Sequence, residues 1–370
     1  MNLSFQKLFY VLATAIALFA ILSVASSILI PMGFALLISF ILLPIAKKLE
    51  SWKLGRIFST FITLFGVLLI LALLFSLFSS ELVDLSAEFE HFKERIFIVF
   101  TDVTMYFNSH FPGIVSFEKD ELLNRIKNWM TESAGTLLQT TVSNTASFLT
   151  GFATTLIYTF LLLIYRDGLV KAMIHFTPVK NRNTVLKMFM SVQQVGQKYF
   201  YGVIIIVTII GFVNSIGLWI IGIESPFLFG FFGAALSIVP YVGTVFGALL
   251  PIAYAFVFYD SLLVPIAVAI LFWAVQLITD NFLSPRIVGG SLQVNALTAI
   301  LSLIIGASVW GIAGMILFLP FAAMLKVVCL HYEELKPLAL LIGNENYREK
   351  PVNVKVFSNW YQKIKRKGLK

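Results

Sequence analysis

The sequence has few charged residues, and this shortage restricts what kind of protein it can be. Only 12% of its 370 residues are charged, whereas 59% are hydrophobic. Soluble domains have about 25% charged and roughly 45–50% apolar residues. A soluble fold could not cover so many apolar side chains with so few polar ones. The composition therefore predicts a polytopic membrane protein.

Cysteine and histidine are also scarce. The single cysteine, Cys329, excludes a disulfide within the chain, and the four histidines lie far apart in the sequence. None of them has a second ligand at the spacing of a metal site, so we expect no metal and no other cofactor. The sequence also lacks the motifs GxxxxGKS/T, HExxH and GxSxG. Their absence argues against an ATP-driven pump and against an enzyme.

The net charge of +8 does not indicate nucleic-acid binding. The basic residues occur in short segments beside apolar runs, where they orient a membrane protein and contact anionic lipid. Residues 47–56 hold four bases and one acid, and residues 166–198 hold six bases and one acid. Both segments should be cytoplasmic. We expect a multi-pass protein of the cell inner (plasma) membrane with cytoplasmic N- and C-termini.

Several apolar runs are long enough to cross a bilayer as helices, which takes about 20 residues. The parity of the crossings agrees with the charge bias of the connecting segments. Pro31 and Gly33 are expected to end the first helix. The sequence thus predicts an all-α protein with about five full spans. The runs cover residues 8–30, 57–80, 148–165, 201–221 and 262–283.

Two further apolar regions are interrupted. Residues 226–239 are too few to cross, and the sequence PYVG separates them from a second short run at 244–258. Residues 292–305 and 309–328 flank the sequence GASVWG in the same way. Each pair predicts a re-entrant helical hairpin, whose irregular tip must be buried in protein or face a water-filled cavity. Paired broken helices predict a transport site near the membrane midplane.

Composition divides the chain into five parts. Residues 81–147 form the one long polar segment, expected to be helical and on the outer side. The other parts are the N-terminal membrane helices (1–80), a span with a cytoplasmic basic helix (148–200), a transport core with both hairpins (201–330) and a basic cytoplasmic tail (331–370).

Polar groups interrupt the last full span in the sequence QLITDNFLSPRIVGG. Gln276 and Asp280 share one helix face at i, i+4 spacing, Asn281 lies beside them, and Pro285 ends the span. Ionisable groups within a span usually face a cavity or a partner, and Arg286 is the nearest candidate partner of Asp280. Three interpretations stay open: an ion pair that closes the inner end, a proton or cation carrier, and a polar lining for a solute.

Three stretches together resemble one known family. They are SPFLFGFFGAALSIVPYVGTVFGALLP, the spaced residues Q-x3-D-N-x3-P-R-x2-G, and GASVWGIAGMILFLPFAAMLKV. This combination resembles the AI-2E transporter family, formerly an uncharacterised permease family, over nearly the whole chain. Asp280 stands where that family usually has glutamate. The resemblance falls on Pro240, Tyr241, Gly243, Gln276, Asp280, Asn281, Pro285, Arg286, Gly289, Gly311, Gly314 and Pro320.

The resemblance implies export of a small solute, with the quorum-sensing signal autoinducer-2 as the namesake substrate. Some members are similar to sodium or proton antiporters, and members assemble as homopentamers, so a homo-oligomer is expected. A sodium (or other cation)/proton antiporter and a non-transporting membrane scaffold are the alternatives. The candidate substrate- or ion-binding residues are Pro240, Tyr241, Gly243, Gln276, Asp280, Asn281, Arg286 and Asn295. The candidate hinge or packing residues are Gly247, Pro285, Gly289, Gly311, Gly314 and Pro320.

Overall fold

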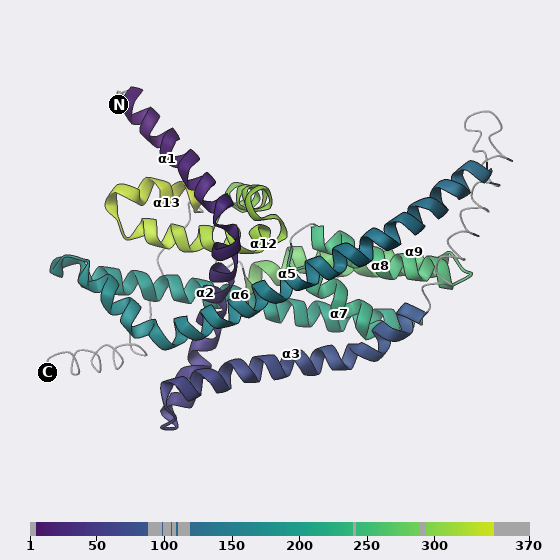
Figure 1. Cartoon of the computed structure of the whole chain (residues 1–370), viewed down its shortest axis with the longest axis horizontal. Coiled ribbons are helices and arrows are strands. Elements are labelled where there is room, and N and C mark those ends of the chain that lie inside the picture. Colours follow the sequence, from purple (N-terminus) through teal and green to yellow (C-terminus); the bar gives the residue numbers. More distant parts are fainter. Residues whose placement is uncertain are drawn as a thin grey trace.

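The computed structural model describes residues 5–87, 119–239, 242–288 and 294–343, together with residues 98, 105 and 109 (Figure 1). Within these ranges the chain is helical apart from turns and one β-bridge between Val294 and Gly343, which confirms the predicted all-α class. The elements are α1 (Phe5–Val24), α2 (Ser26–Ser51), α3 (Arg56–Ala87), α5 (Lys119–His175), η1 (Val179–Asn181), α6 (Arg182–Ile221), α7 (Pro226–Leu236), α8 (Val242–Phe258), α9 (Leu263–Ile278), the π-helical segment η2 (Thr279–Leu283), α10 (Ser284–Ile287), α12 (Ala296–Leu330), η3 (Glu333–Leu335) and α13 (Lys336–Ile342).

Six of the described helical segments are long and apolar enough to cross a membrane, and shorter apolar helices accompany them. The predicted spans at 57–80 and 262–283 correspond closely to two of these segments. The sixth segment is α12, which is interrupted at Gly311. The six segments are Ser26–Ser51, Arg56–Ser79, Thr145–His175, Arg182–Ile221, Leu263–Ile287 and Ala296–Leu330.

The first helix does not end where the sequence suggested. The break lies at Ala25, and α2 then continues through Pro31 and Gly33. Pro31 is the sixth residue of α2 and lacks the backbone hydrogen bond to the Ser27 carbonyl, yet the helix continues past it. Gly33 serves packing instead of a turn, because a Cβ at this position would lie 3.2 Å from the Leu317 side chain of α12.

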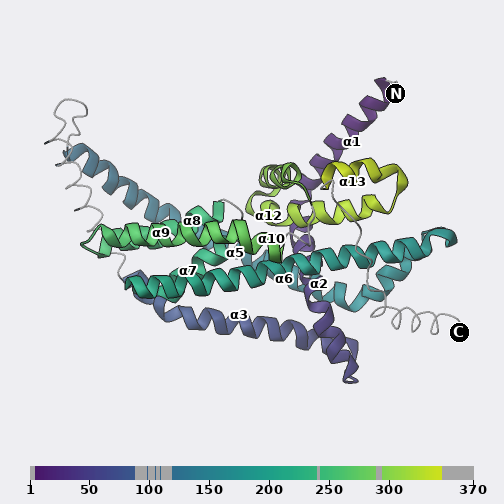
Figure 2. The ribbon, with the colours of Figure 1, turned by 180° about the vertical axis from the view of Figure 1, so that it is seen from behind.

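Helix α6 is the common neighbour of most of the bundle. It packs against α7, α9, α12 and α2, and Figure 2 shows it lying beside α9. Small residues allow the closest of these approaches: a Cβ at Gly230 of α7 would lie 2.3 Å from the Ser215 hydroxyl of α6. A buried cluster at this end of the bundle contains Leu218, Phe229 and Phe272. Backbone proximity of this kind is typical of packed membrane helices.

The first interrupted region forms a hairpin of α7 and α8. Gly233 and Gly247 face each other, and a Cβ at Gly247 would lie 2.8 Å from the Gly233 Cα and carbonyl oxygen. At the tip, a Cβ at Gly243 would overlap the Leu236 carbonyl. Any larger residue at these positions would push the two helices apart.

The second interrupted region lies within α12. Gly311 has φ 59° and ψ −137°, a backbone conformation that glycine adopts at low cost, and the helix breaks there. The backbones of Gly306 and Gly314 then touch, so the chain turns back on itself. Trp310 beside the break donates a hydrogen bond from Nε1 to the Leu22 carbonyl of α1 at 2.9 Å. The interruption predicted around GASVWG is therefore confirmed.

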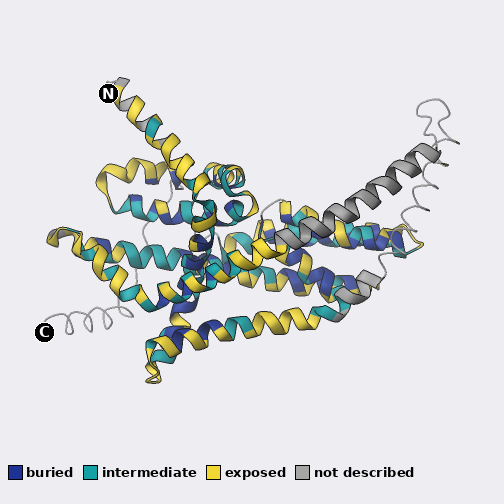
Figure 3. Ribbon diagram, in the orientation of Figure 1, coloured by how far each residue is buried: buried dark blue, intermediate teal, exposed yellow. Residues whose placement is uncertain are grey.

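Burial differs strongly among the long helices (Figure 3). In the most apolar 18-residue stretch of each helix, 11% of the residues of α3 are buried, compared with 39% in α2 and 39% in α12. Apolar residues on exposed faces of a membrane protein contact lipid or another subunit, so α3 is a peripheral helix. The boundaries proposed at 80/81, 147/148 and 200/201 fall inside α3, α5 and α6, and mark changes of composition along continuous helices.

Candidate functional site

The polar stretch of the last full span folds as a distortion of the helix. After α9 the chain forms the π-helical segment η2, and α10 follows it. The Thr279 hydroxyl donates to the Val275 carbonyl at 2.8 Å, and the Asn281 amide donates to the Leu277 carbonyl at 2.8 Å. Side chains thus support the backbone where the helical turn widens. Single π-helical turns occur frequently at functional sites.

One carboxylate dominates this segment. The Gln276 amide donates a hydrogen bond of 2.9 Å to Asp280 Oδ1, as the i, i+4 spacing allows. Asp280 and Asn281 are both exposed, and so is Arg286. No ion pair joins Asp280 to Arg286 in the structure, which describes both residues. The carboxylate therefore keeps most of its hydrogen-bonding capacity for a solute, water or another subunit.

The distorted segment formed by η2 and α10 is packed against the bundle on one side. Gly202 of α6 lies against α10, because a Cβ there would be 2.8 Å from the Val288 side chain and 3.3 Å from the Ile287 carbonyl oxygen. Helix α9 also packs on α6 and α8. Asp280 and Asn281 are exposed, next to the exposed apolar residues Leu277, Ile278 and Phe282. We name Gln276, Asp280 and Asn281 the polar stripe.

Asn295 lies on a different element and is fully engaged there. Its Oδ1 accepts from the Thr298 backbone N–H at 2.8 Å, so it caps the start of α12. Its Nδ2 donates to the carbonyls of Leu341 at 2.7 Å and Gly343 at 3.2 Å. This residue holds α12 and the end of α13 together, and it is not part of the polar stripe.

The remaining sequence-predicted residues fall into three groups. Gly243, Gly247 and Gly314 form backbone contacts within the hairpins, and Gly311 is the break in α12. Pro285 stands in the first turn of α10, and Pro320 is buried inside α12. Pro240, Tyr241 and Gly289 lie outside the described residues.

The two hairpins do not pack extensively on each other in the described part of the chain. Helix α6 contacts both of them, through α7 on one hairpin and α12 on the other. The polar stripe also borders α6 through η2 and α10. If one hairpin moved relative to the other, the contacts of α6 with at least one of them would therefore have to change.

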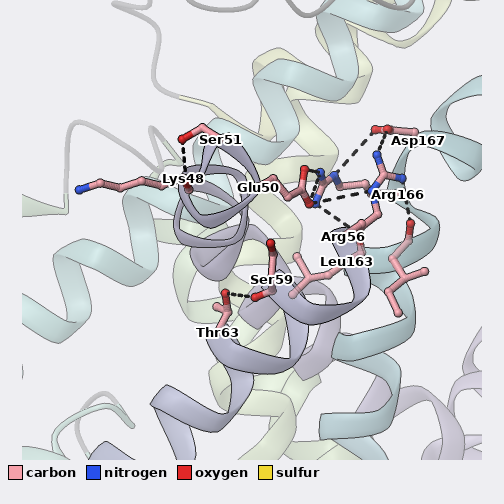
Figure 4. A network of polar contacts seen from close by, with 10 residues as sticks. Lys48, Glu50, Ser51, Arg56, Ser59, Thr63, Leu163, Arg166 and Asp167 are labelled. Carbon is pink, nitrogen blue, oxygen red and sulfur yellow. Dashed lines mark hydrogen bonds and ion pairs between the residues drawn. The ribbon is translucent and has the colours of Figure 1, made fainter. Parts of the chain in front are cut away.

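A second polar region, which is not among the sequence-predicted residues, joins the end of α2, the start of α3 and the C-terminal part of α5 (Figure 4). Arg166 Nη2 donates to both Glu50 carboxylate oxygens at 2.6 and 2.8 Å. Arg56 donates to Asp167 and, at 3.1 Å, to the Ile164 carbonyl. We name Glu50, Arg56, Arg166 and Asp167 the charged junction. The sequence contains one indication of this region: Glu50 and Asp167 are each the single acid in a basic segment, where a basic partner is close at hand.

These features define a class of protein. A polytopic helical bundle with two broken hairpins and a polar, distorted span has the organisation of a membrane carrier. A family model described as "AI-2E family transporter" matches residues 9–334. The chain therefore belongs to the AI-2E transporter family and is a membrane transporter.

Two relatives align over most of this chain, and a third aligns over less than half of it. YrrI of Bacillus subtilis (strain 168), whose name proposes a transport role without a substrate, is 26% identical over 84% of this chain and 88% of its own length. The AI-2 transport protein TqsA of Escherichia coli (strain K12) is 23% identical over 87% of this chain and 91% of its own length. YueF of Bacillus subtilis (strain 168) is 33% identical over a shorter region, 42% of this chain and 41% of its own length.

Proposed function

We propose that this transporter exports a small, uncharged polar solute, with autoinducer-2 or a similar polyol as the substrate class. The observation that carries the proposal is the exposed polar stripe on an otherwise apolar helix. Polar and ionisable side chains within membrane spans face water-filled cavities or partners, because lipid cannot solvate them. The relationship to TqsA supports the substrate class.

The chemistry of the stripe suits hydroxyl groups. Asp280 offers acceptor positions beyond the one that Gln276 occupies. Asn281 uses its amide N–H toward Leu277, which leaves its Oδ1 available as an acceptor. Hydroxyls both donate and accept, so a polyol can satisfy such a set without carrying charge.

Alternating access would use the two hairpins. Glycines bring the backbones of each hairpin into contact, and both hairpins border α6. Tilting of α6 against them would expose the stripe to one side of the membrane and then to the other. We further propose an inner-membrane location with cytoplasmic termini, and assembly as a homo-oligomer.

A cation/proton antiporter is the second candidate, and one observation favours it. Asp280 is an exposed carboxylate that accepts a hydrogen bond from the neutral Gln276 amide, and within the described residues no ion pair links it to Arg286. A carboxylate in that state could bind a proton or a cation during transport. This role requires the charge of Asp280, whereas polyol binding requires only its hydrogen-bonding oxygens.

Flux in proteoliposomes separates these candidates. Wild-type protein and Asp280→Asn would be compared for autoinducer-2 efflux, sodium flux and proton flux under identical gradients. The proposal predicts saturable autoinducer-2 efflux in the wild type, reduced but measurable in Asp280→Asn. Sodium/proton exchange that vanishes in Asp280→Asn, without autoinducer-2 efflux in the wild type, would establish the antiporter instead.

A further inference from the structure

A cavity lies beside the charged junction, away from the polar stripe. It has a volume of about 260 Å³ and is bounded by α2, α5 and α6. Its walls are almost entirely apolar side chains, while its polar lining includes the charged groups Lys47, Arg166 and Asp167. The apolar wall includes Leu36, Phe40, Leu43, Leu162, Phe189 and Met190.

The charged end of the cavity has an excess of positive charge. Lys47 lies within electrostatic range of all four residues of the charged junction. Three cations (Lys47, Arg56, Arg166) and two anions (Glu50, Asp167) give this group a net charge of +1, counted from side-chain types. An apolar chamber beside a net positive charge matches a ligand with an apolar chain and an anionic head.

Arg166 Nε and Asp167 Oδ1 form an ion pair of 3.8 Å at this end, and both atoms are fully buried. They therefore offer no surface to a ligand. Lys47 is the lining cation that lies outside the charged junction, and its ammonium would attract an anionic head group.

We propose that this cavity binds an anionic membrane lipid. One acyl chain would occupy the apolar space between α2, α5 and α6, and the phosphate would lie at Lys47. The position suits a lipid because the cavity adjoins the ends of membrane-spanning helices that carry basic residues, where anionic lipid is attracted. The transported polyol fits poorly, since it has no apolar chain for these walls.

This site goes beyond the proposed transport function and does not depend on it. A lipid at this position would contact three helices at once and would stabilise the arrangement of α2, α5 and α6. Binding can be measured without any flux, so its failure would leave the proposed substrate class untouched.

The direct test is lipid binding to the purified full chain in detergent, measured by native mass spectrometry with dioleoylphosphatidylglycerol and dioleoylphosphatidylcholine as probes. Two methionines of α6 give a matched pair of variants: Met190 lines the cavity, and Met188 does not. Met190→Trp is expected to fill the chamber and reduce phosphatidylglycerol binding at least tenfold, whereas Met188→Trp should bind like the wild type. Equal binding in both variants would overturn the proposal.

Charge gives a second, independent comparison that leaves the apolar wall of the cavity unchanged. Lys47 lines the cavity, while its neighbour Lys48 is exposed and points away from the charged junction in Figure 4. Lys47→Gln should weaken phosphatidylglycerol binding roughly fivefold, because one basic residue contributes about 1 kcal/mol to the attraction of anionic lipid. Lys48→Gln should leave it unchanged. Equal affinity for phosphatidylcholine, or equal competition by free glycerol phosphate, would contradict an anionic lipid as the ligand.

Discussion

The charged junction and the polar stripe contain the same kind of group, a carboxylate on a membrane helix, in opposite states. Glu50 and Asp167 are each 22% exposed in their side chains and paired with arginines. Asp280 is exposed and bonded to one neutral amide. The junction neutralises its charges internally, whereas the stripe leaves its charge available.

This difference separates stability from function. Removing one partner from a partly buried ion pair leaves a charge without compensation, so the junction should matter for the folded state. Removing the exposed carboxylate of Asp280 leaves no buried group unpaired, so the stability of the fold should hardly change. Its effect should appear in transport instead. The four predictions that follow test this separation.

Arg166→Met should have the largest effect. The substitution leaves Glu50 without its two hydrogen bonds from Arg166 and removes the second of two cations near Asp167, so the free energy of unfolding should fall by roughly 2–3 kcal/mol. Lys171→Met, on an exposed position of the same helix, is the matched control and should be near neutral. Unfolding in mixed micelles by increasing SDS measures both. A neutral Arg166→Met would show that the junction contributes nothing to the fold.

Asp280→Asn should reduce transport about tenfold, since a hydrogen bond to a charged group contributes about 1.5–3 kcal/mol. Its stability should stay within about 0.5 kcal/mol of the wild type, as for exposed positions generally. Flux and SDS unfolding on the same preparation provide both values, with Asp260→Asn in the loop before α9 as the control. If Asp280→Asn lost stability but kept its flux, Asp280 would be a structural residue and not a transport residue.

Gln276→Leu should have a smaller effect, a several-fold decrease in flux. The change removes the amide that orients Asp280 at 2.9 Å, while the carboxylate itself remains. A single neutral donor contributes about 1 kcal/mol. The apparent affinity for the solute, taken from the concentration dependence of flux, is the sensitive readout. An unchanged affinity would place the solute away from this end of the stripe.

Lys336→Gln should have the smallest effect. Lys336 and Glu333 pair at 3.2 Å, but their side chains are 53% and 90% exposed. Exposed pairs contribute at most about 1 kcal/mol and often much less. Neither SDS unfolding nor flux should differ from the wild type by more than experimental error. A measurable loss of flux would indicate that α13 takes part in transport.

Much of the fold could be predicted because a membrane span is a local feature: a long run of apolar residues is enough to indicate it. The apolar run at 262–283 corresponds to the observed segment Leu263–Ile287, and the sequence GASVWG contains the break at Gly311. Local composition could not place the first break, because whether Pro31 ends a helix depends on what packs against it. Gly33 fits closely against α12, and the helix continues.

The candidate site was partly predictable for the same reason. The i, i+4 spacing places Gln276 and Asp280 on one helix face, and the structure joins them by a hydrogen bond. Arg286, the candidate partner of Asp280, forms no ion pair with it in the described structure. The pairing of Glu50 with Arg166 joins residues 116 positions apart, and no local pattern specifies it. The second role of Asn295, bonding to Leu341 and Gly343, is equally non-local.

The most direct measurement is the aqueous accessibility of the polar stripe in the membrane. The native Cys329 is 0% exposed, so an introduced cysteine can be labelled selectively with a membrane-impermeant thiol reagent. Asn281→Cys should react readily, and transported solute should protect it, whereas Trp273→Cys on the apolar face of α9 should react slowly. Equally slow reaction at both positions would mean that lipid or protein seals the stripe, and would contradict a solute pathway along it.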